Sequence, residues 1–135
     1  MFRTSCRNIV IGGTVFVWLI KLFIRPNFHF EAPLKFILGV SPNLISSFLI
    51  PFGAYWIYTH TAFFKVRFLR SILFSDTRFV CCLGFLLAVI NEYLQLIPYF
   101  GRTFDYYDIL FTAIGLFISY YSFSALQKRF SYYEL

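Results

Sequence analysis

Charged residues are scarce in this chain of 135 residues. Only 13% of the residues are Asp, Glu, Lys or Arg, whereas about a quarter of a soluble domain is charged. Hydrophobic residues make up 59% of the chain and aromatic residues 24%. A soluble domain of this size exposes about a third of its unfolded-chain surface, and this sequence has too few polar residues to cover it. The composition therefore excludes a soluble globular protein and indicates one that lies in a lipid bilayer.

Cysteine is also rare. The three cysteines are Cys6 and the adjacent pair Cys81 and Cys82, and no Cys or His cluster has the spacing of metal ligands. We therefore expect no disulfide framework, no metal and no cofactor. The net charge of +6 comes from Lys and Arg scattered between apolar runs rather than gathered on one face. This pattern argues against a nucleic-acid partner and makes the basic residues signals of membrane topology.

Four apolar runs are long enough to cross a bilayer. A hydrocarbon core of about 30 Å requires roughly 20 mostly apolar residues in a helix. The sequence predicts spans near residues 8–24, 43–64, 79–98 and 107–126. Helices are expected because unpaired backbone groups are prohibitively costly in lipid, and Pro51 predicts a kink within the second span. We expect an all-α integral membrane four-helix bundle, with residues 1–135 forming one domain.

The basic residues predict the direction of the spans. Eight Lys and Arg flank the spans on the side of the two termini, against three on the other side, which are Arg25, Lys35 and Arg102. The positive-inside rule then places both termini in the cytoplasm. Lys21 is expected to extend to the headgroups beside Arg25. The connection over residues 26–42 mixes charged and aromatic residues, which suits either an interfacial segment or an ordinary loop with buried aromatics.

Acidic residues are the rarest charged groups, and three of the six lie between Glu92 and Asp108. Glu92 precedes the end of the third predicted span by about six residues, so it lies about 9 Å below the surface. An intramembrane carboxyl is costly unless it is paired, protonated or facing water, and it indicates a functional site by default. The next connection is short, so Gln95, Arg102 and Asp105 are expected to lie nearby. This concentration predicts a polar site that faces outward.

Other interpretations of the same residues remain open. Asp105 and Asp108 have the spacing of a capping pair at a helix start, so Asp105 has either a capping or a binding role. Arg102 either clamps one of these carboxylates or binds a lipid phosphate. Small and polar residues also recur along the fourth span, and they predict either close helix packing or a cavity wall. These residues are Asp108, Thr112, Gly115, Ser119 and Ser122.

The polar segments resemble the signature of the VanZ-like family, in which Glu-x-x-Gln and Arg-x-x-Asp precede Asp-x-x-x-Asn-x-x-Gly. Thr112 stands where that family usually has Asn, and Ser119 stands where it commonly has Gly, although Thr can still donate one hydrogen bond. The segment from Ser41-Pro42-Asn43 to Pro51-Phe52-Gly53 resembles the family's second span. The matching residues are Asn91-Glu92-Tyr93-Leu94-Gln95, Gly101-Arg102-Thr103-Phe104-Asp105, Asp108-Ile109-Leu110 and Gly115.

This resemblance implies a small multi-span protein of the bacterial inner membrane. The family's namesake is associated with resistance to the glycopeptide teicoplanin, and the resemblance implies no established reaction. Our leading hypothesis is a module that binds an anionic or sugar-bearing envelope lipid. The alternatives are an accessory subunit with a membrane-protein partner and an enzyme that uses Glu92 and one Asp as general acid and base. The candidate ligand-binding residues are Glu92, Gln95, Arg102, Asp105, Asp108 and Thr112.

Overall fold

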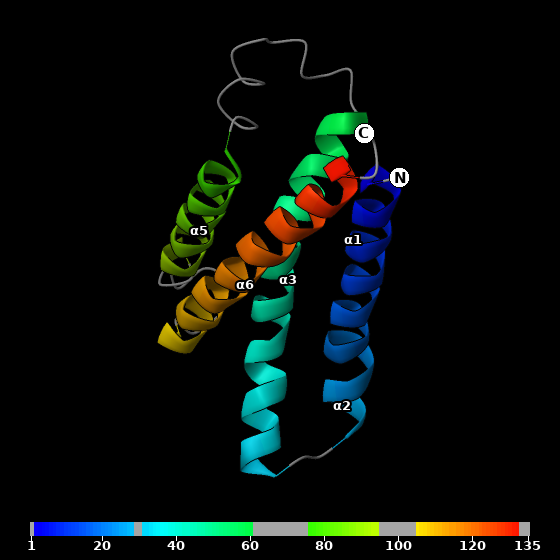
Figure 1. Ribbon diagram of the computed structural model, residues 1–135. Coiled ribbons are helices and arrows are strands. Elements are labelled where there is room, and N and C mark those ends of the chain that lie inside the picture. Colours follow the sequence, from blue (N-terminus) through cyan, green and yellow to red (C-terminus); the bar gives the residue numbers. More distant parts are fainter. Residues whose placement is uncertain (1, 29–30, 61–75, 95–104, 133–135) are drawn as a thin grey trace.

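The computed structural model describes residues 2–28, 31–60, 76–94 and 105–132, and every regular element in these ranges is helical (Figure 1). The helices that cross the bundle are α1 (Phe2–Leu19), α3 (Ala32–His60), α5 (Thr77–Leu94) and α6 (Tyr106–Tyr132). A π-helical turn, η1 (Ile20–Ile24), and the short α2 (Arg25–Asn27) extend α1. The all-α prediction is confirmed for the described part of the chain.

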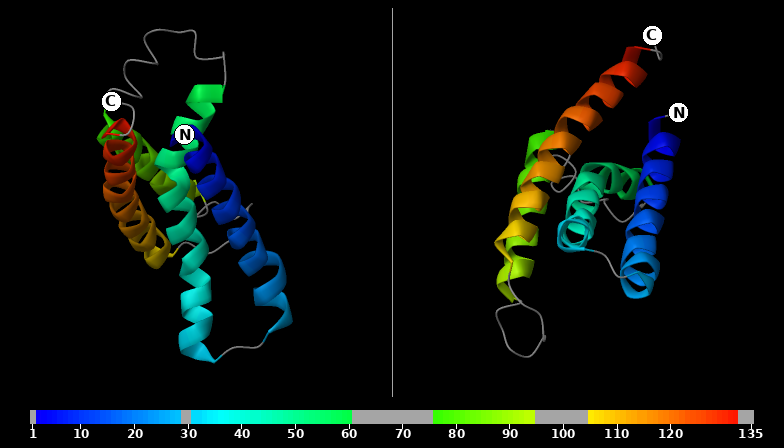
Figure 2. Two further views of the ribbon diagram at one scale, coloured as in Figure 1. Left: turned by 45° about the vertical axis from the view of Figure 1, so that its right-hand side comes forward. Right: turned by 90° about the horizontal axis from the view of Figure 1, so that it is seen from below.

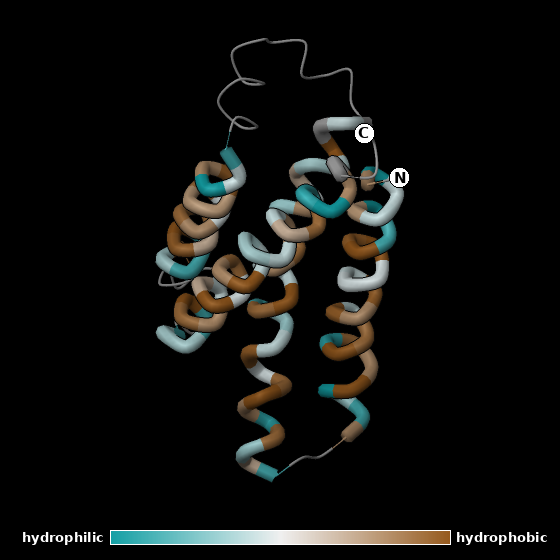
Figure 3. Tube along the Cα trace, in the orientation of Figure 1, coloured by the Kyte–Doolittle hydropathy of each residue, from teal (hydrophilic) through white to brown (hydrophobic). Residues whose placement is uncertain are grey.

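Four of the described segments are long and apolar enough to cross a membrane: Phe2–Asn27, Ala32–Ile57, Thr77–Leu94 and Tyr106–Phe130. Many of their large apolar side chains are exposed, and the exposed fraction is 63% for Trp18 and 67% for Leu22. Apolar residues occur along every helix in Figure 3. An outward apolar surface of this extent is expected where lipid is the solvent, so the chain has the architecture of a multi-pass membrane protein.

The central helix of the bundle is α3. It contacts α1, α5 and α6, and its contact with α6 is the most extensive in the bundle. In Figures 1 and 2, α1 and α5 lie on opposite sides of α3. The described core is therefore built around α3, with α6 as its main partner.

Aromatic residues form the core near the two ends of the described chain. The ring of Phe2 lies 4.8 Å from that of Tyr55 and 5.5 Å from those of Phe123 and Phe130. Cys6 is fully buried beside this cluster. These contacts join the start of α1 to the end of α6, so both ends lie at the same end of the bundle, as four successive spans require (Figure 1).

The second span begins eleven residues earlier than expected, at Ala32 rather than at residue 43. Pro42 was expected to mark a helix start, but it lies inside the 29-residue α3 together with Pro51. The interpretation of residues 26–42 as an ordinary loop is therefore wrong from Ala32 onward, and the interfacial position of this segment stays a prediction. The reason is physical, because membrane helices tolerate internal proline where neighbouring groups satisfy the freed backbone. The predicted ends of this span at 64 and of the third at 98 lie outside the described residues.

The long helix α3 is not straight. Its two halves run in different directions in Figure 2, where the view from below shows the lower part nearly end-on. Internal proline removes a backbone hydrogen bond and crowds the preceding turn, which bends a helix. The two prolines of α3 therefore explain the bend.

Candidate functional site

A proline inside a helix leaves the carbonyl four residues earlier without its usual donor. For Pro42 this carbonyl belongs to Leu38. The guanidinium of Arg25 in α2 donates to it from Nε at 3.0 Å and from Nη2 at 2.6 Å. Nη2 also donates to the carbonyl of Gly39. The Oγ of Ser41 donates a longer hydrogen bond, of 3.4 Å, to the same carbonyl. Arg25 is thus the main replacement for the missing backbone donor, and it links the first membrane segment to α3.

Asp108 lies in the first turn of α6 and is half-buried. The side-chain amide of Asn43 in α3 donates a hydrogen bond to its carboxylate. Arg25 and Lys21 lie close enough to interact with its charge. Lys21 belongs to η1, and π-helical turns in membrane and soluble helices frequently mark functional sites. Asp108 therefore lies near groups from two other segments, the first membrane segment with Lys21 and Arg25 and helix α3 with Asn43. These four residues are called the polar cluster below.

Asp105 caps α6. Its Oδ1 accepts a hydrogen bond from the backbone N–H of Tyr107 at 2.9 Å, and its carbonyl accepts one from the N–H of Asp108 at 3.2 Å. A carboxylate in this position satisfies an unpaired N–H group and is favoured by the positive end of the helix dipole. The capping role predicted for Asp105 is confirmed. Its charge also acts on Asp108, so it borders the polar cluster.

Glu92 lies near the end of α5 and is 8% exposed. The register between α5 and α6 is set where Arg78 Nε donates to Tyr120 Oη at 3.2 Å. Glu92 follows Arg78 by fourteen residues, and Tyr106 precedes Tyr120 by fourteen. Because the two helices are antiparallel, Glu92 lies at the level of Tyr106, at the end of the bundle that holds Asp108.

Thr112, Gly115 and Ser119 are buried along one side of α6. A Cβ atom on Gly115 would collide with the backbone carbonyl of Leu44 in α3. The Oγ of Ser119 donates a hydrogen bond to the carbonyl of Phe48, also in α3. The small residues of the fourth span therefore form a packing surface, and the packing interpretation is confirmed for Gly115 and Ser119.

Two predicted site residues, Gln95 and Arg102, lie outside the described residues, so their proximity to Glu92 stays a prediction. The structure instead adds Lys21, Arg25 and Asn43 to the cluster. Sequence reasoning assigned the two cations to the headgroup region and Asn43 to a helix start. One signal in the sequence could have predicted the position of Arg25. If Pro42 lies inside a helix, the carbonyl of Leu38 requires another donor, and a nearby cation can supply it.

The cysteines are dispersed. Cys6 is buried, Cys81 half-buried and Cys82 exposed, and all three are free thiols. Among the residues with described positions, no three His, Cys, Asp or Glu side chains gather in a way that could hold a metal ion. The chemistry of the described site is therefore that of cations, carboxylates and one amide.

Comparisons of this chain with protein-family models, with curated proteins and with solved structures found no match. The resemblance to the VanZ-like family rests on the sequence motifs alone. The function is accordingly inferred from the geometry of the site.

Proposed function

We propose that this protein is a multi-pass protein of the bacterial inner membrane that binds the headgroup of an envelope lipid or glycolipid. The observation that carries the proposal is the position of Asp108, which is hydrogen-bonded to Asn43 and lies within electrostatic range of Arg25 and Lys21. Arg25 is held there by its hydrogen bonds to the carbonyls of Leu38 and Gly39, one turn before Asn43 in α3. Ionisable groups within membrane helices are costly and mark functional sites by default. Cations paired with hydrogen-bonding groups suit a ligand that carries both phosphate and hydroxyl groups.

The cations have different parts in this proposal. Arg25 is engaged with the carbonyls of Leu38 and Gly39, so it fixes the local structure. Lys21 is exposed, and its long stem lets the ammonium group reach a phosphate at the surface. Asn43 and Asp108 would then bind hydroxyl groups of the headgroup. Glu92 and, by the sequence prediction, Gln95 and Arg102 would extend the site on the α5 side.

We further propose that the site faces outward. It lies at the end of the bundle opposite to Phe2 and Phe130, and the distribution of Lys and Arg favours the cytoplasm for the end that holds the termini. An outward site meets envelope lipids and their glycosylated forms. Together with the VanZ-like resemblance, this supports an influence on susceptibility to teicoplanin-type glycopeptides.

The test is native mass spectrometry of the gently solubilised protein. The wild type is expected to retain a specific lipid. In the double variant Lys21→Gln, Asp108→Asn the occupancy of this lipid is expected to fall about tenfold, because one charge-assisted hydrogen bond contributes roughly that factor to affinity. Lys35→Gln is the matched control, because Lys35 is an exposed lysine in the first turn of α3, outside the cluster. The control should retain the lipid, and equal losses in both proteins would refute the site.

The same experiment separates the two alternatives. A stoichiometric protein partner retained by the wild type and the double variant, with no specific lipid, would make the protein an accessory subunit. A covalent product formed by the pure protein, and lost in Glu92→Gln, would support the acid–base enzyme. The pair Glu92→Gln, Arg102→Ala extends the lipid test to the α5 side of the site, where the binding proposal expects a second loss of lipid.

A further inference from the structure

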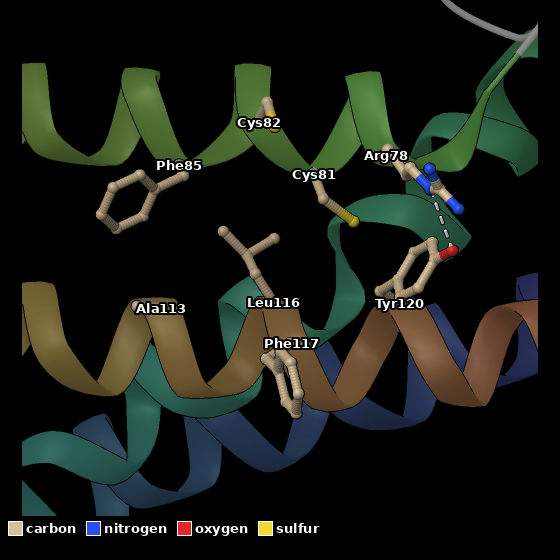
Figure 4. A pocket seen from close by; sticks show the side chains of 8 residues that line it. All are labelled: Arg78, Cys81, Cys82, Phe85, Ala113, Leu116, Phe117 and Tyr120. Carbon is tan, nitrogen blue, oxygen red and sulfur yellow. Dashed lines mark hydrogen bonds between the residues drawn. The ribbon is translucent and has the colours of Figure 1, made fainter.

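A second site lies between α5 and α6, away from the polar cluster. It is a pocket of about 320 Å³ with walls from both helices (Figure 4). Arg78 of α5 and Tyr120 of α6 lie at one end of it, joined by their hydrogen bond. The remaining walls are apolar and include Cys81, Phe85, Ala113 and Phe117.

The pocket is a groove that follows the helix axes. Four residues of α5 line it, and they share one face of that helix because Cys81 and Cys82 lie three and four positions from both Arg78 and Phe85. From Arg78 to Phe85 the helix rises by about 10 Å at 1.5 Å per residue. Since α6 runs antiparallel, Ala113 lies toward the Phe85 end. The groove is thus an apolar channel with polar groups at one end only.

The guanidinium of Arg78 can make further hydrogen bonds. Its Nε donates to the hydroxyl of Tyr120, while the carboxylate of Asp76 accepts from the backbone N–H of Arg78 and caps α5. Among the residues that the structure describes, Tyr120 accepts the hydrogen bond from Nε of the guanidinium, and the Asp76 carboxylate lies close enough to interact with its charge. This hydrogen bond uses Nε and not the two terminal nitrogens. Arg78 is the second residue of its span and is exposed, so it lies at the depth of lipid headgroups.

We propose that this groove binds an anionic glycerophospholipid. One acyl chain lies between Phe85 and Ala113, and the phosphate is bound by the guanidinium of Arg78 beside the hydroxyl of Tyr120. Charge complementarity identifies the occupant, because the fork of an exposed guanidinium fits a phosphate, whereas a purely apolar helix would offer it no acceptor. Arg78 and Asp108 lie at opposite ends of the α5–α6 pair, so this lipid is independent of the ligand at the polar cluster.

The proposal is tested by titrating the purified full-length chain with phosphatidylglycerol and with phosphatidylcholine under native mass spectrometry. The wild type is expected to bind phosphatidylglycerol about tenfold more tightly, the value of one good charge-assisted contact. Arg78→Gln should lower its affinity to that for phosphatidylcholine. Ala113→Phe, which fills the groove, should weaken both lipids. Arg129→Gln is the control, since Arg129 is an exposed arginine farther along α6 that does not line the groove.

Three outcomes would overturn the proposal. The first is an equal loss of affinity in Arg129→Gln and Arg78→Gln, and the second is unchanged lipid binding in Ala113→Phe. The third is that the wild type binds a second protein chain in the groove and that Ala113→Phe loses this chain rather than a lipid. A second experiment, photolabelling, tests the groove in the wild type without any variant. Phosphatidylglycerol with a photoreactive group in the middle of its acyl chain is expected to label the peptides that contain Phe85 and Phe117. Labelling confined to other helices would refute the groove, even where Ala113→Phe lowers the yield of folded protein.

Discussion

The two sides of α6 differ in how closely they approach their neighbours. Toward α3, Gly115 and Ser119 are buried, and the backbones come close enough for a side chain to bind a carbonyl of the other helix. Toward α5, the aromatic residues Phe117 and Tyr120 border a groove. Lipid supplies no hydrophobic force between helices, so packing and hydrogen bonds decide where they close. One helix therefore has a closed interface on one side and an open one on the other.

The largest expected effect comes from breaking the closed interface at Gly115. Gly115→Leu should destabilise the bundle by about 3 kcal/mol or more, because the added side chain collides with the backbone of α3 at Leu44, which cannot rotate away. Thermal unfolding in detergent, followed by circular dichroism, measures the loss.

Gly12→Leu is the matched control. A Cβ atom on Gly12 meets no atom within 4 Å, so this variant should stay within about 0.5 kcal/mol of the wild type. If Gly115→Leu is equally mild, α3 and α6 are not in close contact there.

The next effect concerns the interface between the first segment and α3. Arg25→Leu should cost about 1–3 kcal/mol, because the Leu38 carbonyl then keeps only the long hydrogen bond of 3.4 Å from Ser41 Oγ. Pro42→Ala restores a backbone N–H for that carbonyl, so Arg25→Leu should cost less in the Pro42→Ala background. Unfolding of the four proteins of this cycle measures the coupling. Equal costs in both backgrounds would show that Arg25 does not compensate for Pro42.

A smaller loss is expected at the hydrogen bond across the closed interface. Ser119→Ala removes the donor to the Phe48 carbonyl, and such bonds between membrane helices contribute about 0.6 kcal/mol on average. Unfolding by titration with a denaturing detergent can resolve this difference. Ser46→Ala, at an exposed serine of α3, provides the baseline, and an equal loss there would argue against the bond.

The smallest effect is expected on the open side. Ala113→Leu places its extra carbons in the groove, where space exists, and should change stability by less than about 0.5 kcal/mol. Ala113 and Gly115 are two positions apart on α6 and lie on different sides of it. Introducing leucine at each position therefore compares the loss of stability on the two sides directly. A loss at Ala113 as large as that at Gly115 would mean that the groove is closed.

The sequence predicted the closed side better than the open one. Gly115 and Ser119 stand out because small and polar residues are unusual in an otherwise bulky helix, and their spacing places them on one face. Ala113, Phe117 and Tyr120 are ordinary residues for a membrane helix. Whether they enclose a groove depends on the path of α5, and no local pattern in the sequence specifies that path.

Only part of the polar cluster was predicted from the sequence, because the rest of it also depends on how the helices pack. Asp105 and Asp108 were identified because acidic residues are rare, and the capping role of Asp105 follows from local spacing. Lys21 and Asn43 were not assigned to the site, because their proximity to Asp108 depends on how three distant segments pack. The start of α3 was missed because a proline such as Pro42 usually indicates the start of a helix. Its place inside α3 is understood only when the donor to the Leu38 carbonyl is known, and that donor is Arg25.

The contact between Arg25 and α3 has a consequence for the synthesis of the chain. A helix with an internal proline that enters the bilayer by itself carries an unsatisfied carbonyl into the hydrocarbon. Here the donor precedes the acceptor in the sequence, so Arg25 has already been translated when Leu38 and Pro42 leave the ribosome. The first two membrane segments can therefore insert as a hairpin in which the earlier one stabilises the later one.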